Sequence, residues 1–506
     1  SVNQYNSYRK VYPITPADSS CFLNNSKKAQ RSCIIPKSIK QRADLEQNKI
    51  LALLNPRSIY AIKGDMQSYL ETMLHIDSEA QENFLQNIPL LAYSFIYKDP
   101  PPSFRDTALE VFKCFYQDSI PESDLYTLIA KAFPFKVPVF PIDPRTYVLD
   151  LTHGSSGFCT DFGARMTAQL VNYFYQQSGL PLHILFAGKP FDTLSLAIAF
   201  SELSDIHSTF LYPEYGAQSS VEPLLYSLPK NIHVYKINGT AADGKTIIHT
   251  IADDKDINRA FELFVPDTAQ ISYLLSYTSC YIYAALTVLS RASYDNSIEN
   301  PNLVIGMPLR MQNGLSAAVL AKKMNVPITG FLTSSDAVDS SPETIYAKEY
   351  ATVHTLYKTK HSAGNAAVLQ ADIAVQQLAK NTRLDAIRSC NDRTGYIISP
   401  AAAELWHIWN TIRNGAKHKS PLSANVSEFA ASHTATPTWI SDKAVAESCI
   451  SIIVEPSHPS FYAESIKTAT GREPPIPHRL ECNPQTIQEP PLLNNSVTAL
   501  KEQLFS

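Results

Sequence analysis

The chain has 506 residues, a formal net charge of −4 and a hydrophobic fraction of 44%. This length is enough for a large core, and the nearly balanced charge excludes the strongly basic surface typical of proteins that bind nucleic acid or anionic membranes. No apolar run reaches the roughly 18 residues that a membrane-spanning helix needs. We therefore expect a cytoplasmic protein, monomeric or homodimeric, whose partner is a small molecule or another protein.

The elements expected in chain order begin with an irregular polar segment, residues 1–50, followed by helical spacing of apolar residues from about 45 to 135. A proline-rich connector is expected at 134–145. From 146 onward, short apolar strands alternate with helices, which predicts mostly parallel sheets covered on both faces. The expected strands are TYVLDLTH (146–153), LHILFA (182–187), STFLYP (208–213), IHVYKIN (232–238), NLVIGMP (302–308), VPITGFL (326–332) and CISIIVEP (449–456).

Cysteine and histidine spacing gives no sign of a metal site. The eight cysteines are widely spaced and form no Cys-x-x-Cys pair, whereas a disulfide framework or a zinc ribbon would cluster them. No H-E-x-x-H motif is present either. We expect reduced, mostly buried thiols and no bound metal.

One stretch matches a nucleotide-binding motif literally. Residues 239–246 read GTAADGKT, the G-x-x-x-x-G-K-[ST] pattern whose backbone N–H groups cradle phosphates in P-loop proteins. The preceding segment alternates apolar and polar residues, unlike the buried strand that normally precedes a P-loop, and no apolar strand ending in Asp follows. We interpret the match as chance. No G-x-S-x-G and no G-x-G-x-x-G motif occurs.

A distinctive segment, LDLTHGSSGFCTDFGAR, covers residues 149–165. It resembles the signature of threonine synthase, L-x-H-G-P-T-x-A-F-K-D-x-G, with the same spacing and with His153, Gly154, Asp161 and Gly163 matching. Threonine synthases are enzymes of fold type II that depend on pyridoxal phosphate (PLP).

The resemblance continues along the chain. Further similar segments are Y-N-S-Y-R at 5–9, L-Y-P at 211–213, A-K-K-M-N-V-P-I at 321–328, Y-I-I-S-P at 396–400 and S-H-P at 457–459. The resemblance implies an α/β fold of PLP type II, with mostly parallel sheets in a large and a smaller domain beside an N-terminal domain. The implied ranges are an N-terminal domain 1–140, an α/β core 141–506, a smaller subdomain at about 181–290, a loop-rich insertion at about 412–440 and a wrapping tail at about 456–506.

The chain departs from the family at the residues that carry its chemistry. The resemblance places the lysine that bonds to PLP at Thr160, and a hydroxyl cannot form that Schiff base. The glycine-rich phosphate loop corresponds to 308–314, where the longer side chains Arg310, Gln312 and Asn313 tend to fill the cradle. Arg310 could instead grip an anion. The residue facing the pyridine nitrogen corresponds to Pro456, which has no donor.

Three hypotheses remain. In the first, the chain is a threonine synthase-like pseudoenzyme that has lost PLP, holds no cofactor and acts by binding a ligand or partner. In the second, it is a cofactor-independent lyase, dehydratase or cyclase that works in the emptied site. In the third, it remains a PLP enzyme with a displaced lysine, Lys189. The candidate acid–base groups of the second hypothesis are His153, Asp161, Lys189, Asp192 and His458.

Overall fold

A computed structural model describes residues 88–116, 120–175, 182–214, 220–254, 262–268, 270–295, 301–336, 353, 356, 372–378, 380–417, 437–441, 443–481 and 490–504. Most of the predicted N-terminal domain and most of the predicted insertion at 412–440 lie outside these residues. The chain divides into two units, Ser1–Asp44 and Leu45–Ser506, and all described residues belong to the second.

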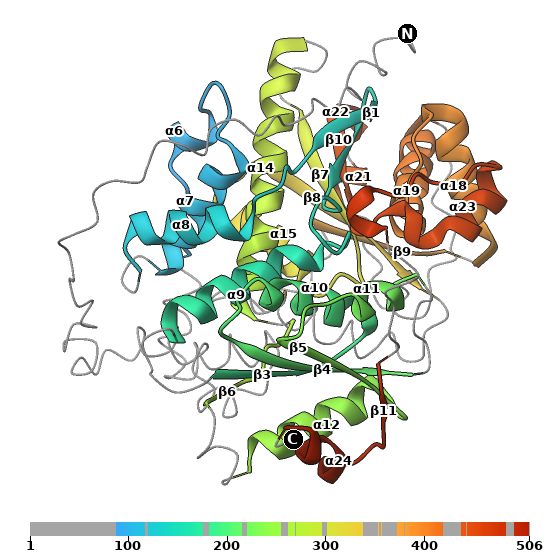
Figure 1. Cartoon of the computed structure of the whole chain (residues 1–506). Helices are drawn as coiled ribbons and strands as arrows, with labels where there is room; N and C mark the ends of the chain where they lie inside the picture. Colours follow the sequence, from blue (N-terminus) through green and yellow to red (C-terminus); the bar gives the residue numbers. More distant parts are fainter. Residues whose placement is uncertain are drawn as a thin grey trace, which may run out of the picture. The chain divides into compact units, whose positions relative to one another are not determined.

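The larger sheet has six strands in the order β1-β2-β10-β7-β8-β9 (Figure 1). All neighbouring pairs are parallel except the first, in which β1 runs antiparallel to β2. Parallel sheets occur almost only where helices cover both of their faces. This explains why strand β10 is buried along its whole length. The strands are β1 (Val139–Asp143), β2 (Thr146–Asp150), β7 (Asn302–Pro308), β8 (Ile328–Asp336), β9 (Ile373–Leu378) and β10 (Cys449–Glu455).

The smaller sheet has five parallel strands in the order β11-β5-β4-β3-β6. Helix α10 packs on one face and α12 on the other, with the last helix, α24, packed against α12 (Figure 1). The strands are β3 (Leu182–Ala187), β4 (His207–Pro213), β5 (Ile232–Ile237), β6 (Glu262–Phe264) and β11 (Leu492–Leu493).

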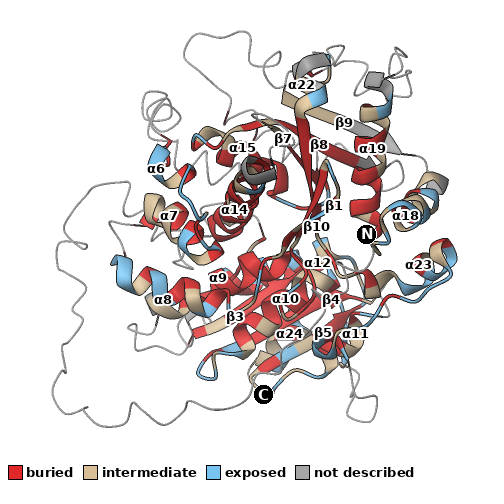
Figure 2. Cartoon of the chain, turned by 90° about the horizontal axis from the view of Figure 1, so that it is seen from above, coloured by how far each residue is buried: buried red, intermediate tan, exposed pale blue. Residues whose placement is uncertain are grey.

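Helices cover both faces of the larger sheet. Helices α14 and α15 pack on one face in the largest apolar cluster, and α19 packs on the other with buried Trp406 and Trp409. Figure 2 shows α9, α10 and α14 almost wholly buried, whereas α8, α18 and α23 keep exposed faces. The helices are α6 (Tyr93–Ile96), α7 (Phe104–Tyr116), α8 (Glu122–Ala132), α9 (Thr160–Tyr175), α10 (Pro190–Ser201), α11 (Glu222–Tyr226), α12 (Ala241–Ala252), α14 (Ile271–Asp295), α15 (Gly314–Lys323), α18 (Lys380–Thr394), α19 (Pro400–Lys417), α21 (Thr438–Ser441), α22 (Lys443–Ser448), α23 (Ala463–Thr470), α24 (Val497–Leu504) and the short 3₁₀ turns η2 (Pro459–Tyr462) and η3 (His478–Leu480).

Several expected boundaries differ from the structure. The proline-rich connector at 134–145 contains strand β1, because edge strands tolerate the missing N–H of Pro141. The loop expected from 412 begins inside α19, which ends at Lys417. The expected wrapping tail adds β11 to the smaller sheet and α24 to its helical layer.

Helix α14 begins ten residues before YIYAALTVLSRA (281–292), the stretch in which the apolar spacing predicts a helix. Its segment Ile271–Ala292 is long and apolar enough to span a bilayer, but 94% of it is buried within the protein. It is therefore a buried core helix of the fold.

Candidate functional site

The turn that follows β2 meets the turn that follows β10. The Cys159 N–H donates to the Pro456 carbonyl at 2.7 Å, and the His458 N–H donates to the Gly157 carbonyl at 2.8 Å. Phe158 and Ser457 form an isolated bridge between the same segments. Because β2 and β10 are parallel neighbours, both turns leave the carboxyl end of the larger sheet, where ligands of open α/β sheets bind.

Thr160 lies in a closed network of hydroxyl groups. Its Oγ1 is 2.6 Å from the Ser195 Oγ of α10, and Ser195 is 2.9 Å from the Ser156 Oγ. The Phe158 N–H donates to the Ser156 Oγ at 3.2 Å. These side chains are all buried, so the position that the family resemblance gives to the reactive lysine is occupied by a hydroxyl whose hydrogen bonds are made within the protein.

Asp161 follows Thr160 in the first turn of α9 and is fully buried. Its Oδ2 accepts from the Ser156 N–H at 2.8 Å and lies against Gly154, where a Cβ would come within 2.2 Å of that oxygen. Its other oxygen, Oδ1, has no hydrogen-bond partner among the described residues. Burial raises the pKa of Asp161 to about 6, despite the opposing hydrogen bonds from Ser156.

Asp192 lies in the first turn of α10 and is surrounded by protein atoms while keeping some exposed surface. Burial raises its pKa to about 7, and the charges of Lys189 and Lys245 act against this rise. Lys189 itself is exposed, and its Nζ lies 5.8 Å from the centre of the Phe191 ring. The starts of α9 and α10 therefore carry one fully buried carboxyl group, Asp161, one partly exposed carboxyl group, Asp192, and an exposed lysine, Lys189.

The two candidate histidines are engaged elsewhere in the turns. The His153 Nε2 is 3.1 Å from the Asp150 Oδ2. Burial alone would raise the pKa of Asp150, but the hydrogen bond and charge of His153 outweigh it and lower the pKa. The His458 Nδ1 accepts from the Ser460 N–H at 3.2 Å and caps η2. Burial, with the charge of Arg479, lowers the pKa of His458 to about 4, which favours the neutral ring that accepts this capping bond.

The loop at 308–314 joins β7 to α15. Arg310 and Gln312 are exposed, whereas Asn313 is buried with φ of 65°. Gln312 Oε1 accepts from the Thr268 hydroxyl and Asn313 Nδ2 donates to the Thr268 carbonyl, both at 2.8 Å. The side chains of Gln312 and Asn313 thus tie this loop to Thr268, in the segment before α14.

Two residues that hold these turns in place were not predicted from the sequence. Ser195 bridges Ser156 and Thr160, and its signal was a serine within an otherwise apolar helix. Arg479 donates to the carbonyls of Thr152 at 2.6 Å and Gly154 at 2.9 Å, which braces the turn from the far end of the chain. No local pattern in the sequence marks that contact.

The GTAADGKT stretch does not form a phosphate cradle. Thr240 is the N-cap of α12, and its side chain and that of Asp243 form a reciprocal capping box. A carboxylate therefore occupies the helix N-terminus that would have to face a phosphate. Within the described parts of the chain, no group of three or more His, Cys, Asp or Glu residues could hold a metal ion.

Comparison with known proteins places the chain among relatives of threonine synthases. No protein-family model matches the chain. It is 27% identical over 260 residues to the threonine synthase of Buchnera aphidicola subsp. Baizongia pistaciae, covering 51% of this chain and 59% of that protein. It is 26% identical over 243 residues to the Escherichia coli K12 threonine synthase, covering 48% and 55%. The matches thus span little more than half the length of these relatives.

Solved structures agree on the fold. The threonine synthase of Escherichia coli aligns with a TM-score of 0.62 at 19% identity, over 83% of this chain and 91% of that one. The PLP-bound threonine synthase of Brucella melitensis aligns with a TM-score of 0.63 at 17% identity, over 82% and 91%. The α/β architecture is therefore fold type II of the PLP enzymes, as the sequence predicted.

The same comparisons correct one expectation. We expected that the chain binds no cofactor, and this expectation is wrong. The relatives are threonine synthases, and one of the similar structures is a threonine synthase with PLP bound. The replacement of the lysine by Thr160 affects how PLP could be attached to the protein. It does not exclude PLP as a cofactor.

Proposed function

Because the chain is a relative of the threonine synthases and has their fold, we propose that it keeps the family's ligand site and has lost the family's covalent catalysis. It acts as a pseudoenzyme that binds a PLP-type ligand or a partner. The single observation that carries this proposal is the buried Thr160, whose hydroxyl lies 2.6 Å from the Ser195 Oγ.

PLP, when bound, supplies an electron sink for amino-acid chemistry, and the family attaches it through a lysine amine. A threonine hydroxyl does not fit that attachment, since an imine requires an amine nitrogen. Ser195 supports the same conclusion, because its Oγ is the hydrogen-bond partner of the Thr160 hydroxyl and is itself bonded to the Ser156 Oγ.

The two other hypotheses have weaker support. A displaced lysine would have to be Lys189, which is exposed at the N-cap of α10 with its amine over the Phe191 ring. A cofactor-independent enzyme would use Asp161 and Asp192, whose raised pKa values suit proton transfer near neutral pH. Its expected histidines do not complete such a site, since His458 caps η2 and His153 pairs with Asp150.

We also propose a cytoplasmic protein, monomeric or homodimeric, that binds neither nucleic acid nor membranes. The mild net charge of −4 supports this assignment, as does the burial of the one helix among the described residues that is long and apolar enough to span a bilayer.

A direct test supplies the purified protein with PLP and assays threonine formation, with the Escherichia coli threonine synthase run in parallel under conditions in which it is active. We expect no threonine above the uncatalysed background from this chain. Threonine formation that requires PLP would overturn the proposal. Loss of that activity in Lys189→Gln would then identify the displaced lysine.

A further inference from the structure

Three aromatic rings from three separate segments meet at the turn that follows β2. Phe158 belongs to that turn, Phe191 to the first turn of α10 and Phe461 to η2. The Phe158 ring stacks on the Phe461 ring, with centres 4.3 Å apart and planes at 17°, and its centre is 5.6 Å from that of the Phe191 ring. Phe158 is 5% exposed, whereas the two outer rings are only partly buried. The rings therefore form a small apolar contact near the surface, within a cluster distinct from the largest core.

A fourth side chain, Leu480 of η3, joins this contact from the C-terminal part of the chain. A Cβ added at Gly157 would lie 2.9 Å from Leu480 and 3.0 Å from Phe461, so both side chains lie against this glycine. Leu480 is 7% exposed, while its neighbour Arg479 is exposed and holds the same turn through its two bonds to carbonyls. We call the four apolar side chains the latch: Phe158, Phe191, Phe461 and Leu480.

The latch lies beside the buried hydroxyl network. Helix α10 carries Phe191 and, four residues later, Ser195, so both side chains lie on one side of the helix. The Ser195 Oγ is 2.6 Å from the Oγ1 of Thr160, which is two residues beyond Phe158. The beginning of α10 therefore meets the chain at 158–160 twice, once through rings and once through hydroxyl groups. A movement that separates the rings also separates these hydroxyl groups and uncovers Thr160.

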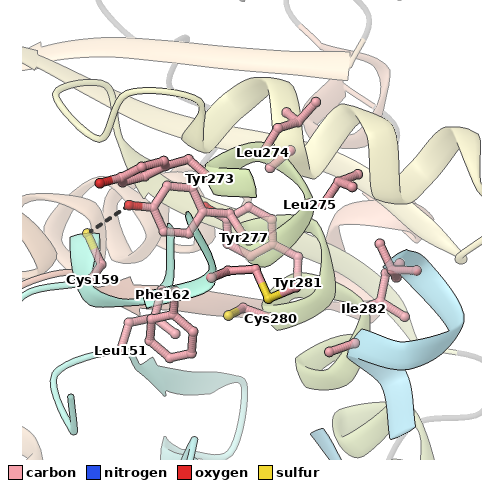
Figure 3. Packing of buried hydrophobic residues seen from close by; sticks show 14 of the residues in the cluster. Leu151, Cys159, Phe162, Tyr273, Leu274, Leu275, Tyr277, Cys280, Tyr281 and Ile282 are labelled. Carbon is pink, nitrogen blue, oxygen red and sulfur yellow. Dashed lines mark hydrogen bonds between the residues drawn. The ribbon is translucent and has the colours of Figure 1, made fainter. Parts of the chain in front are cut away.

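Cys159, between Phe158 and Thr160, is a natural reporter of such a movement. It is 6% exposed, and its Sγ accepts a hydrogen bond from the Tyr277 hydroxyl of α14 at 3.7 Å (Figure 3). Burial raises the pKa of this thiol to about 12. Alkylating reagents react with the exposed thiolate and not with a buried thiol, so Cys159 is protected while the latch is closed.

We propose that the latch opens locally and that its opening controls access to the turn that carries Thr160. Small contacts with partly exposed members separate at a lower free energy than the large cores that they adjoin. A ligand or partner then reaches the turn only after this conformational step. The inference rests on the proposed function only in taking this turn as part of the ligand site, because the opening itself is measured without any ligand.

Pulse labelling of the full chain with N-ethylmaleimide, mapped by mass spectrometry, measures the opening. Cys449 of β10 is 1% exposed in the core on the α19 side of the larger sheet, so its labelling reports global unfolding. We expect Phe191→Ala and Leu480→Ala to raise the ratio of Cys159 to Cys449 labelling at least tenfold, because each removes a side chain that packs in the latch. Phe191→Leu keeps an apolar side chain, is the safer variant for folding, and should raise the ratio two- to fivefold.

Phe140→Ala is the matched control. It removes a partly buried ring of β1 that packs edge-on against Tyr396, with centres 5.5 Å apart, outside the latch. We expect a ratio no higher than that of the wild type, whatever the loss of stability, because global unfolding labels both cysteines.

An unchanged ratio in the latch variants, or a parallel rise in the labelling of both cysteines, would overturn the inference. Labelling of the wild-type Cys159 as fast as in the urea-unfolded chain would do the same, since the latch would then give no protection. Threonine formation in the assay with PLP overturns the proposed function instead and leaves the labelling result as it is.

Discussion

Replacing Glu455 by glutamine is expected to stabilise the protein at neutral pH. Glu455 ends β10, is 1% exposed and pairs in register with Asp150 of β2. Its Oε2 accepts from the Ser399 N–H at 3.0 Å, and its Oε1 has no partner among the described residues. Burial raises its pKa to about 8, and the charge of Asp150 adds to the rise. The folded protein therefore holds a proton here that the unfolded chain releases.

The magnitude follows from linkage. The pKa of Glu455 is 4.5 in the unfolded chain and about 8 in the folded protein. Its contribution to the free energy of unfolding is therefore fully present below pH 4.5 and is lost as the pH rises from 4.5 through 8. At pH 7 the penalty is about 3 kcal/mol, from about 1.4 kcal/mol for each pH unit above 4.5. Glu455→Gln removes the ionisable group and keeps an acceptor for Ser399, so its gain is about 3 kcal/mol at pH 7 and close to zero at pH 4.5.

Urea unfolding of both proteins at several values between pH 4.5 and 8 measures this gain, with the exposed Glu464→Gln of α23 as the matched control. The reasoning is refuted if the difference between wild type and Glu455→Gln is the same at every pH, or if the variant is less stable at pH 7. Either result would mean that Glu455 is ionised and held by a favourable partner.

Three further changes have defined outcomes. Arg165→Lys loses the paired bonds to Glu202 at 2.6 and 2.8 Å and should lower the free energy of unfolding by about 2–4 kcal/mol in urea titrations; a loss below 1 kcal/mol would contradict it. Gly163→Ala forces a Cβ to within 2.0 Å of the Tyr273 ring and should cost about 1–3 kcal/mol, visible as a lower melting temperature; an unchanged melting temperature would refute that packing. Burial lowers the pKa of His183 to about 4, so the free energy of unfolding falls as the pH falls from 6.5 toward 4. His183→Gln should remove about 2–3 kcal/mol of that loss. Parallel pH profiles of unfolding for the variant and the wild type would argue against it.

Two controls separate these effects from general destabilisation. Gly306→Ala introduces a Cβ whose nearest neighbours lie at 3.8 Å, so it should leave the melting temperature nearly unchanged where Gly163→Ala lowers it. Lys467→Gln removes an exposed pair with Glu473 and should cost less than about 1 kcal/mol, in contrast to the buried Arg165.

The fold was predictable from the sequence where periodicity is strong. The expected strands at 182–187 and 302–308 match β3 and β7 residue for residue. Short apolar runs bounded by Gly and Pro are typical of buried strands in a parallel sheet, and the bounding residues mark where each strand begins and ends. Strand β1 was missed because Pro141 within it and the prolines on either side resemble a connector, and β11 was missed because two residues carry no pattern. Their pairing depends on tertiary contacts that no local window contains.

The site was predictable only in part. The motif at 153–165 singles out Thr160 and Asp161, and the structure shows that both lie in the first turn of α9. Ser195 and Glu455 lie 35 and 56 residues from their hydrogen-bond partners Thr160 and Ser399, so their roles emerge only when the chain is folded. His458 was considered as an acid–base group, and its capping bond to Ser460 could be read only from the turn geometry.

The loss of covalent catalysis is tested most directly by chemical trapping. The protein is incubated with PLP, reduced with borohydride, digested and mapped by mass spectrometry, with the Escherichia coli threonine synthase as the positive control. We predict a pyridoxyl-lysine peptide from the control and none above the level of random surface labelling from this chain. A stoichiometric pyridoxyl adduct on a single lysine, such as Lys189, would contradict the account.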